Sequence, residues 1–257
     1  MRPRRSLRAK GDAAVSAARE TVAWASRILA YYGHGDLTLG HVSIRAADRV
    51  YMKRKGVGLE EVVPADVQIF DLDGRKMDGD GGVHLEVPLH TEVYRARPDV
   101  GAVIHTHPLW SLALGAVETP LRYLAHDALL FPDGLGIFEE TSDLITNVET
   151  GGAVAQALGS RRAVLMRNHG VLIVGRTVGW AVLAALALER AVHLQSVAGS
   201  LGTLVPIPDR GVPALHASKY REEFIEEYWE YWLRCLRRAG LNDGMPARPR
   251  ERRSRGG

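Results

Sequence analysis

Cysteine is nearly absent from this chain of 257 residues, which contains only Cys235. A single cysteine can form neither an intrachain disulfide nor a cysteine-based zinc site, so any metal site must rest on histidine and carboxylate side chains. Long apolar runs are also missing. The longest covers residues 177–188, whereas a membrane-spanning helix needs about 20 residues. The basic N-terminus is not followed by the apolar stretch of a signal peptide. We therefore expect a soluble cytoplasmic protein without a membrane partner.

Acidic residues are too few to balance the basic ones, and the formal net charge is +3. A basic protein of this kind could bind nucleic acid, but the charge is unevenly distributed. Residues 1–10 carry +5 and residues 246–257 carry +4, which leaves −6 for residues 11–245. Both ends are rich in Arg and poor in apolar residues, which is typical of disordered tails. We expect one domain over 11–245 between two disordered basic tails, and no nucleic-acid partner.

Hydrophobic periodicity predicts an α/β fold with a mainly antiparallel central sheet and helices packed on it. Alternating residues on both sides of a short turn predict a hairpin that pairs 42–45 with 50–53. Further strands are expected at 67–74, 100–105, 163–166 and 171–174. Helices are expected at 12–32, 86–97, 142–158 (with Ser142 as the N-cap), 177–200 and 217–238.

Histidine is well represented, with ten residues. His105 and His107 lie two apart at the end of a predicted strand, so their side chains point to the same face. His169 lies in a tight turn between two apolar strands, where a buried turn could direct its ring towards the same place. Three neutral imidazoles that leave an open coordination position are typical of a catalytic metal site. On its own, an HxH pair is equally compatible with two polar groups at a strand end.

Glu86 begins the predicted helix that precedes the strand of His105. A carboxylate at this place could be a fourth metal ligand or a general base. It could also be a first-turn glutamate that the helix dipole favours. His90 follows four residues later on the same helix face, where it could orient Glu86 or simply pack.

Three segments in order, GHVSIR (40–45), HLEVPLHTEVYRARPDVGAVIHTHP (84–108) and RNHGVLIVG (167–175), resemble the class II aldolase/adducin family. This resemblance implies a three-layer α/β/α sandwich that usually assembles as a homotetramer. It also implies that His105, His107 and His169 bind a divalent metal ion and that Glu86 is the catalytic carboxylate. Zinc is expected first, with manganese, iron or cobalt as alternatives. Family members that are not enzymes have lost metal ligands, which this chain keeps, so we expect a lyase that acts on a small molecule.

Departures from the sugar-phosphate aldolases of this family indicate which branch of the family the chain resembles. Gly40-His41, Lys55-Gly56 and His84-Leu85 stand where those aldolases have small residues that suit a phosphate group. The chain looks more like the branch that holds hydroxy-aromatic acid decarboxylases. Three alternatives stay open, namely a non-haem iron oxygenase, a sugar-phosphate aldolase or epimerase, and an adducin-like scaffold that is not an enzyme.

Several further residues are candidates for the site. Tyr123 lies where some aldolases of the family place a catalytic tyrosine. A substrate carboxylate requires cations or hydrogen-bond donors near the metal, and arginine suits forked contacts with carboxylates. The predicted substrate-binding residues are His41, Ser43, Arg45, Lys55, Gly56 and His84.

Overall fold

The computed structural model describes residues 3–246, with side chains from residue 11 onward, and contains one eight-stranded sheet. The strand order is β4-β3-β2-β1-β5-β8-β7-β6, and every neighbouring pair is antiparallel except β6 and β7, which are parallel. The strands are β1 (His41–Ala46), β2 (Arg49–Lys53), β3 (Val67–Asp71), β4 (Lys76–Asp78), β5 (Ala102–Thr106), β6 (Gly136–Phe138), β7 (Ala163–Met166) and β8 (Gly170–Gly175). The predicted mainly antiparallel sheet is confirmed.

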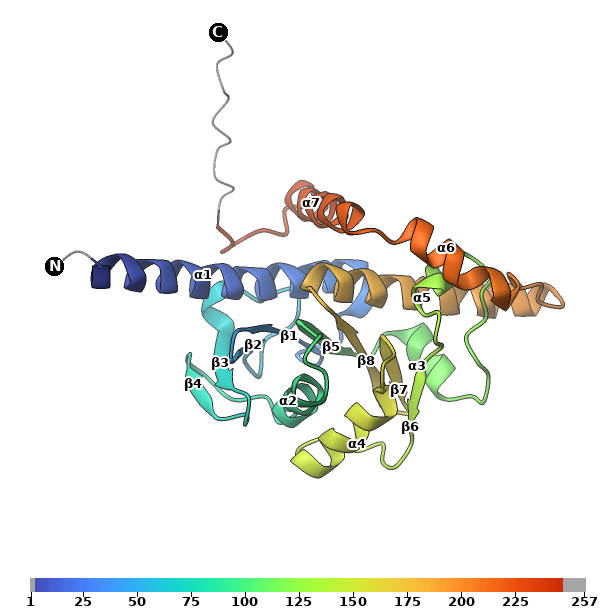
Figure 1. Ribbon diagram of the computed structural model, residues 1–257, viewed down its shortest axis with the longest axis horizontal. Coiled ribbons are helices and arrows are strands. Elements are labelled where there is room, and N and C mark those ends of the chain that lie inside the picture. Colours follow the sequence, from blue (N-terminus) through green and yellow to red (C-terminus); the bar gives the residue numbers. More distant parts are fainter. Residues whose placement is uncertain (1–2, 247–257) are drawn as a thin grey trace, which may run out of the picture.

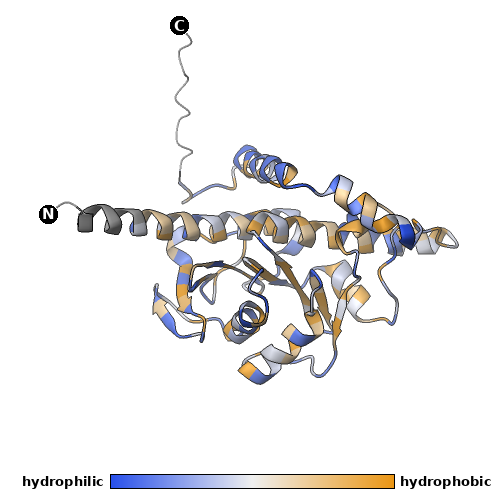
Figure 2. Ribbon diagram, viewed as in Figure 1, coloured by the Kyte–Doolittle hydropathy of each residue, from blue (hydrophilic) through white to orange (hydrophobic). Residues whose placement is uncertain are grey.

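Helices cover both faces of this sheet, as Figure 1 shows. The α-helices are α1 (Pro3–Leu29), α2 (Val87–Ala96), α3 (Leu109–Gly115), α4 (Val148–Leu158), α5 (Val178–Leu201), α6 (Val212–Lys219) and α7 (Glu222–Arg238), of which α7 packs on α1 and α5. Alternation along β5 supplies both cores: Ile104 packs in the core beneath α1 and α5, whereas Val103 packs in the core with α2 and α4. The strands between the two layers are predominantly hydrophobic (Figure 2). The three-layer α/β/α arrangement is therefore the one predicted.

Helix α5 is the central helix of one layer. The side chain of Thr177 caps its first turn by accepting a hydrogen bond from the Trp180 main-chain N–H. Its 24 residues are long and apolar enough to span a membrane, but half of the relevant window is buried within the protein. Ala184 and Leu188 on its buried side are fully inaccessible to solvent. The burial agrees with the core helix expected from the sequence.

Three helix boundaries differ from the prediction. Helix α4 begins at Val148 rather than near Ser142, because the Asn147 side chain caps it by accepting from the Thr150 N–H. The predicted C-terminal helix is two helices, α6 and α7, separated at Tyr220. Helix α1 begins at Pro3, so residues 3–10, expected to be disordered, continue a helix that their Arg, Leu, Ala and Lys residues favour. Residues 1–2 and 247–257, which make up the rest of the predicted tails, lie outside the described residues.

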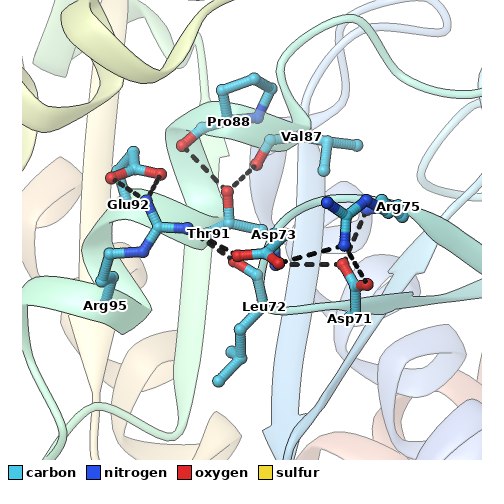
Figure 3. A network of polar contacts seen from close by, with 9 residues as sticks. All are labelled: Asp71, Leu72, Asp73, Arg75, Val87, Pro88, Thr91, Glu92 and Arg95. Carbon is cyan, nitrogen blue, oxygen red and sulfur yellow. Dashed lines mark hydrogen bonds and ion pairs between the residues drawn. The ribbon is translucent and has the colours of Figure 1, made fainter.

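A polar network anchors α2 to the turn that joins β3 and β4 (Figure 3). The Arg95 guanidinium forms an ion pair with Glu92 on its own helix and with Asp73 in the turn. It also donates to the main-chain carbonyl of Leu72. The network holds α2 against the face of the sheet to which His105 of β5 points, so it positions the helix that Glu86 precedes.

Candidate metal and catalytic site

The three predicted metal ligands converge at one end of the sheet. His105 lies on β5, His107 follows the end of that strand, and His169 lies in the turn between β7 and β8. The ring centroid of His105 lies 4.8 Å from that of His107 and 5.0 Å from that of His169. One nitrogen of each ring falls within 4.8 Å of the others. The structure thus brings together the three histidines that the sequence singled out.

Backbone conformation in the β7–β8 turn makes this approach possible. Asn168 adopts a positive φ of 55°, which asparagine tolerates better than most residues. At Gly170, an added Cβ would lie 2.6 Å from the His107 ring and 2.9 Å from the Thr106 carbonyl oxygen. Only glycine allows the backbone to approach the two histidines so closely. The geometry of the turn that carries His169 therefore requires glycine at position 170 and suits asparagine at position 168.

Two of the three imidazoles are oriented through their Nδ1 atoms. His105 Nδ1 lies 3.1 Å from the Val171 carbonyl oxygen, and His107 Nδ1 lies 3.2 Å from a carboxylate oxygen of Asp36. Both partners are acceptors, so each Nδ1 carries the hydrogen and each Nε2 presents a lone pair. The two Nε2 atoms lie only 3.1 Å apart. Two lone pairs facing each other at this distance suit a cation that both can bind.

Burial keeps these rings in the neutral form that binds metals. It lowers the pKa of His169 to about 4 and that of His107 below its usual value, although Asp36 opposes the latter shift. The pKa of the fully buried His105 falls well below its usual value, because burial and the neighbouring histidines both disfavour the charged ring. The donor set, neutral imidazoles with a nearby carboxylate, therefore fits a divalent metal ion.

Glu86 lies beside this cluster as the residue that precedes helix α2. Its Oε2 is 3.7 Å from His105 Nε2, and its Oε1 is 3.7 Å from His169 Nε2. Oε1 also accepts a hydrogen bond from the Ile145 main-chain N–H. Burial raises the pKa of this carboxyl, an effect that the Ile145 hydrogen bond partly offsets. Glu86 is thus placed both to accept a proton and to approach a metal ion.

A cavity of about 490 Å³ opens in front of the cluster. Glu86, His107 and His169 line it, together with two predicted substrate-binding residues, Lys55 and His84. His84 Nε2 is buried and has no hydrogen-bond partner among the described residues, so it is available to a substrate. Gly56 does not line the cavity. Its positive φ of 81° turns the chain directly after Lys55.

Arg45 and Tyr123, which the sequence also proposed for the site, lie outside this cavity. The Arg45 guanidinium donates to main-chain carbonyls at the far end of α2, because Arg45 lies four residues along β1 from the site end of that strand. The Tyr123 hydroxyl donates to the carbonyls of Phe131 and Pro132. Neither side chain lines the cavity.

His41 and Ser43 lie behind Glu86 rather than in the cavity. Both are completely buried. His41 Nε2 lies 3.2 Å from Glu86 Oε2, and Ser43 Oγ lies 2.7 Å from His90 Nδ1. His90 contacts His41 and Ser43 instead of orienting Glu86 directly.

Sequence reasoning missed Asp36 and the apolar part of the cavity. Asp36 meets His107 across 71 residues of sequence, and no local pattern signals such a contact. Leu39, Leu85 and Leu144 also line the cavity, and each is about half exposed. Partly exposed leucines beside a polar cluster offer a surface for an apolar group of a ligand.

The fold is that of known class II aldolases. An aldolase II superfamily protein from Pseudomonas syringae superposes with a TM-score of 0.80, which covers 90% of this chain and 96% of that one at 24% sequence identity. The sequence model of the Class II Aldolase and Adducin N-terminal domain matches residues 20–196. This protein therefore belongs to the class II aldolase and adducin family.

Two curated relatives indicate the chemistry of the family. The chain is 31% identical over 220 residues to a 3,4-dihydroxyphthalate decarboxylase from Arthrobacter keyseri, covering 77% of this chain and 86% of that protein. It is 34% identical over 149 residues to a 4-hydroxy-3-prenylphenylpyruvate oxygenase/4-hydroxy-3-prenylbenzoate synthase from Streptomyces roseochromogenus subsp. oscitans, covering 57% of this chain and 54% of that protein. Its relatives include decarboxylases and aldolases, which are lyases.

Proposed function

We propose that this protein is a divalent-metal-dependent carbon–carbon lyase that decarboxylates a hydroxy-aromatic acid or a similar hydroxy acid. The observation that carries the proposal is a cavity that opens in front of the three-histidine cluster and is lined by Glu86 and by apolar side chains. The likeness to a 3,4-dihydroxyphthalate decarboxylase supports the same reaction class. We propose zinc as the metal, with manganese, iron or cobalt as alternatives, and a cytoplasmic homotetramer as the functional form.

The lining of the cavity supports an aromatic acid more than a sugar phosphate. Leu39, Leu85 and Leu144 offer apolar surface to a planar ring. Lys55 is the one lysine or arginine among the described residues that line the cavity, and it can pair with a substrate carboxylate. A phosphate group is usually bound by several converging N–H and hydroxyl donors.

Glu86 carries the proton transfers in the proposed reaction. A bound divalent ion would supply Lewis-acid stabilisation of negative charge on a substrate oxygen. Glu86 takes the proton of the substrate hydroxyl and returns it to the ring carbon that bears the carboxylate. The bond from that carbon to the carboxyl carbon then breaks, its electron pair returns to the ring, and CO₂ and a phenolate leave. The raised pKa of Glu86 favours holding the proton between these two steps.

The test is turnover of a panel of hydroxy-aromatic acids and sugar phosphates by protein of known metal content, with and without oxygen. We expect oxygen-independent release of CO₂ from a hydroxy-aromatic acid. Glu86→Gln should lower kcat by about 100-fold or more. The matched control is Glu118→Gln, which makes the same change at an exposed glutamate and should leave kcat unaltered.

Other products would contradict the proposal in identifiable ways. Release of an aldehyde from a sugar phosphate alone would assign aldol cleavage. Oxygen uptake that is coupled to product formation would assign the oxygenase chemistry that the name of the Streptomyces roseochromogenus relative indicates. Loss of all activity after removal of oxygen would likewise exclude the lyase.

A further inference from the structure

A continuous hydrogen-bonded chain of side chains runs from Glu86 into the interior of the protein. Glu86 Oε2 lies 3.2 Å from His41 Nε2, and His41 Nδ1 lies 2.6 Å from His90 Nε2. His90 Nδ1 lies 2.7 Å from Ser43 Oγ, which lies 2.8 Å from the Tyr94 hydroxyl. All five residues are at least 96% buried. Glu86 also lines the cavity, whereas the other four residues lie behind it and are shielded from water.

When Glu86 is ionised, the chemistry of the five groups fixes the direction of every hydrogen bond. Both His41 and His90 are completely buried, which disfavours a charged ring, so each ring is neutral and has one N–H and one bare nitrogen. An ionised Glu86 can only accept, so His41 must donate from Nε2. Its Nδ1 is then bare and accepts from His90 Nε2. His90 Nδ1 accepts from the Ser43 hydroxyl, which in turn accepts from Tyr94.

If every hydrogen bond of the chain ran in the opposite direction, the contact between His41 and an ionised Glu86 would be unfavourable. If His41 carried its hydrogen on Nδ1, its bare Nε2 would face the Glu86 carboxylate at 3.2 Å, with two acceptors in contact. Such a pair in a buried site costs free energy, because neither group is satisfied. When Glu86 is ionised, all of these hydrogen bonds can therefore form together in only one direction, with His41 donating to Glu86.

We propose that His41 is a positioning residue, held as the Nε2–H tautomer by His90, Ser43 and Tyr94, that fixes the orientation of the Glu86 carboxylate. This inference rests on the proposed function, in which Glu86 transfers the proton. His41 Nε2, Glu86 and His105 lie close enough together to hold a metal ion by themselves. A hydrogen on Nε2 removes that lone pair, so His41 is excluded from the metal ligands and keeps one oxygen of Glu86 occupied.

The first test is a direct measurement of the tautomer. Histidine nitrogen chemical shifts of ¹⁵N-labelled, zinc-loaded protein distinguish a hydrogen on Nε2 from one on Nδ1, and the His41 signal is assigned with His41→Gln. We expect Nε2–H for His41 and for His90. A hydrogen on Nδ1 of His41 would overturn the inference, whatever the protein catalyses.

Variants of His90 test the consequence for catalysis. His90→Leu removes the donor to His41 Nδ1, whereas His90→Gln keeps an amide donor near the position of Nε2. We expect His90→Leu to lower kcat by about 10- to 100-fold with KM changed less than about twofold and bound metal unaltered, and His90→Gln to recover most of the loss. The control His126→Leu changes an exposed histidine outside the site and should have no effect.

The remaining outcomes separate this inference from the proposed function. Loss of bound metal in folded His41→Gln would make His41 a ligand and overturn the inference. Unchanged kcat in folded His90→Leu would also overturn it. If His90→Leu does not fold, Ser43→Ala, which removes the donor to His90 Nδ1, takes its place with the same expected direction. A protein that shows the Nε2–H tautomer and binds metal, but releases no CO₂ from any acid, would support the tautomer assignment and overturn only the proposed decarboxylation.

Discussion

Replacing Arg45 with methionine separates a structural role for this residue from the carboxylate-binding role that its sequence position suggested. Arg45 Nη1 donates to the Tyr94 carbonyl, and Nη2 lies within 3.2 Å of the carbonyls of Arg97, Pro98 and Val100. These carbonyls belong to the end of α2 and to the turn before β5. A cation at the C-terminus of a helix is also favoured by the helix dipole.

The expected loss of stability follows from the number of hydrogen bonds that the Arg45 guanidinium can donate. Nη1 makes one of these contacts, and the two hydrogens of Nη2 serve three acceptors, so the guanidinium makes about three hydrogen bonds. At about 1 kcal/mol for each, at a half-buried site, Arg45→Met should lower the free energy of unfolding by about 3 kcal/mol. For a domain of this size the melting temperature should fall by about 6 to 12 °C.

Urea and thermal unfolding, followed by circular dichroism, measure this loss, and steady-state kinetics measures KM on the same samples. Arg49→Met is the matched control. Arg49 lies across the hairpin turn with an exposed side chain, so its stability change should stay within about 0.5 kcal/mol. We expect Arg45→Met to destabilise the protein with little change in KM. A tenfold rise in KM without any loss of stability would refute the reasoning and return Arg45 to the substrate site.

Lys55→Met should raise KM about 10- to 100-fold with a smaller change in kcat, because it removes the cation that faces the cavity. An unchanged KM in steady-state kinetics would contradict this. Chelation should abolish activity and lower the melting temperature, with recovery on addition of zinc, and His105→Ala should bind no metal by elemental analysis. Tyr123→Phe should keep kcat within about twofold, since its hydroxyl donates to two main-chain carbonyls, and a tenfold loss would support a catalytic role. Burial lowers the pKa of Lys53 from 10.5 to about 8. The unfolded chain therefore binds the proton more strongly than the folded protein between these pH values, and stability rises as the pH increases through them. The gain should be on the order of 3 kcal/mol and absent from Lys53→Met in urea unfolding at pH 8 and 10.5.

The local part of the fold and of the site could be predicted from the sequence. The hairpin followed from alternation around a polar turn, and its pairing of Ser43 with Met52 is in the register expected. His105 and His107 followed from their spacing on a strand, and His169 from its turn between two apolar strands. These features depend on residues within a few positions of one another. The three-residue strands β4 and β6 were missed because so short a segment carries no periodicity.

Contacts between distant segments could not be predicted in the same way. Asp36 orients His107 from the loop after the first helix, and Ile145 donates to Glu86 across 59 residues. The start of α4 was misplaced because side chains near Ser142 bond to neighbouring main-chain atoms, which favours a turn over a helix. In each case the deciding partner is supplied by the tertiary structure, and the residue type alone fits several roles.

The packing of β1 against α2 explains why three residues of one strand face have different roles. The strand supplies His41, Ser43 and Arg45, and the helix segment supplies Glu86, His90 and Tyr94. Two residues along a strand advance by about 6.6 Å, and four residues along a helix advance by about 6 Å. The two elements start at the histidine cluster and run in the same direction, so each second strand residue meets each fourth helix residue. The contacts of each pair therefore depend on its distance from the histidine cluster along β1 and α2. The first step joins His41 to the Glu86 carboxylate, the middle step joins Ser43 to His90, and the last step, about 13 Å from the first, places Arg45 at the end of the helix. Arg45 belongs to the same short motif as His41, but the length of the strand between them places it out of reach of the cavity.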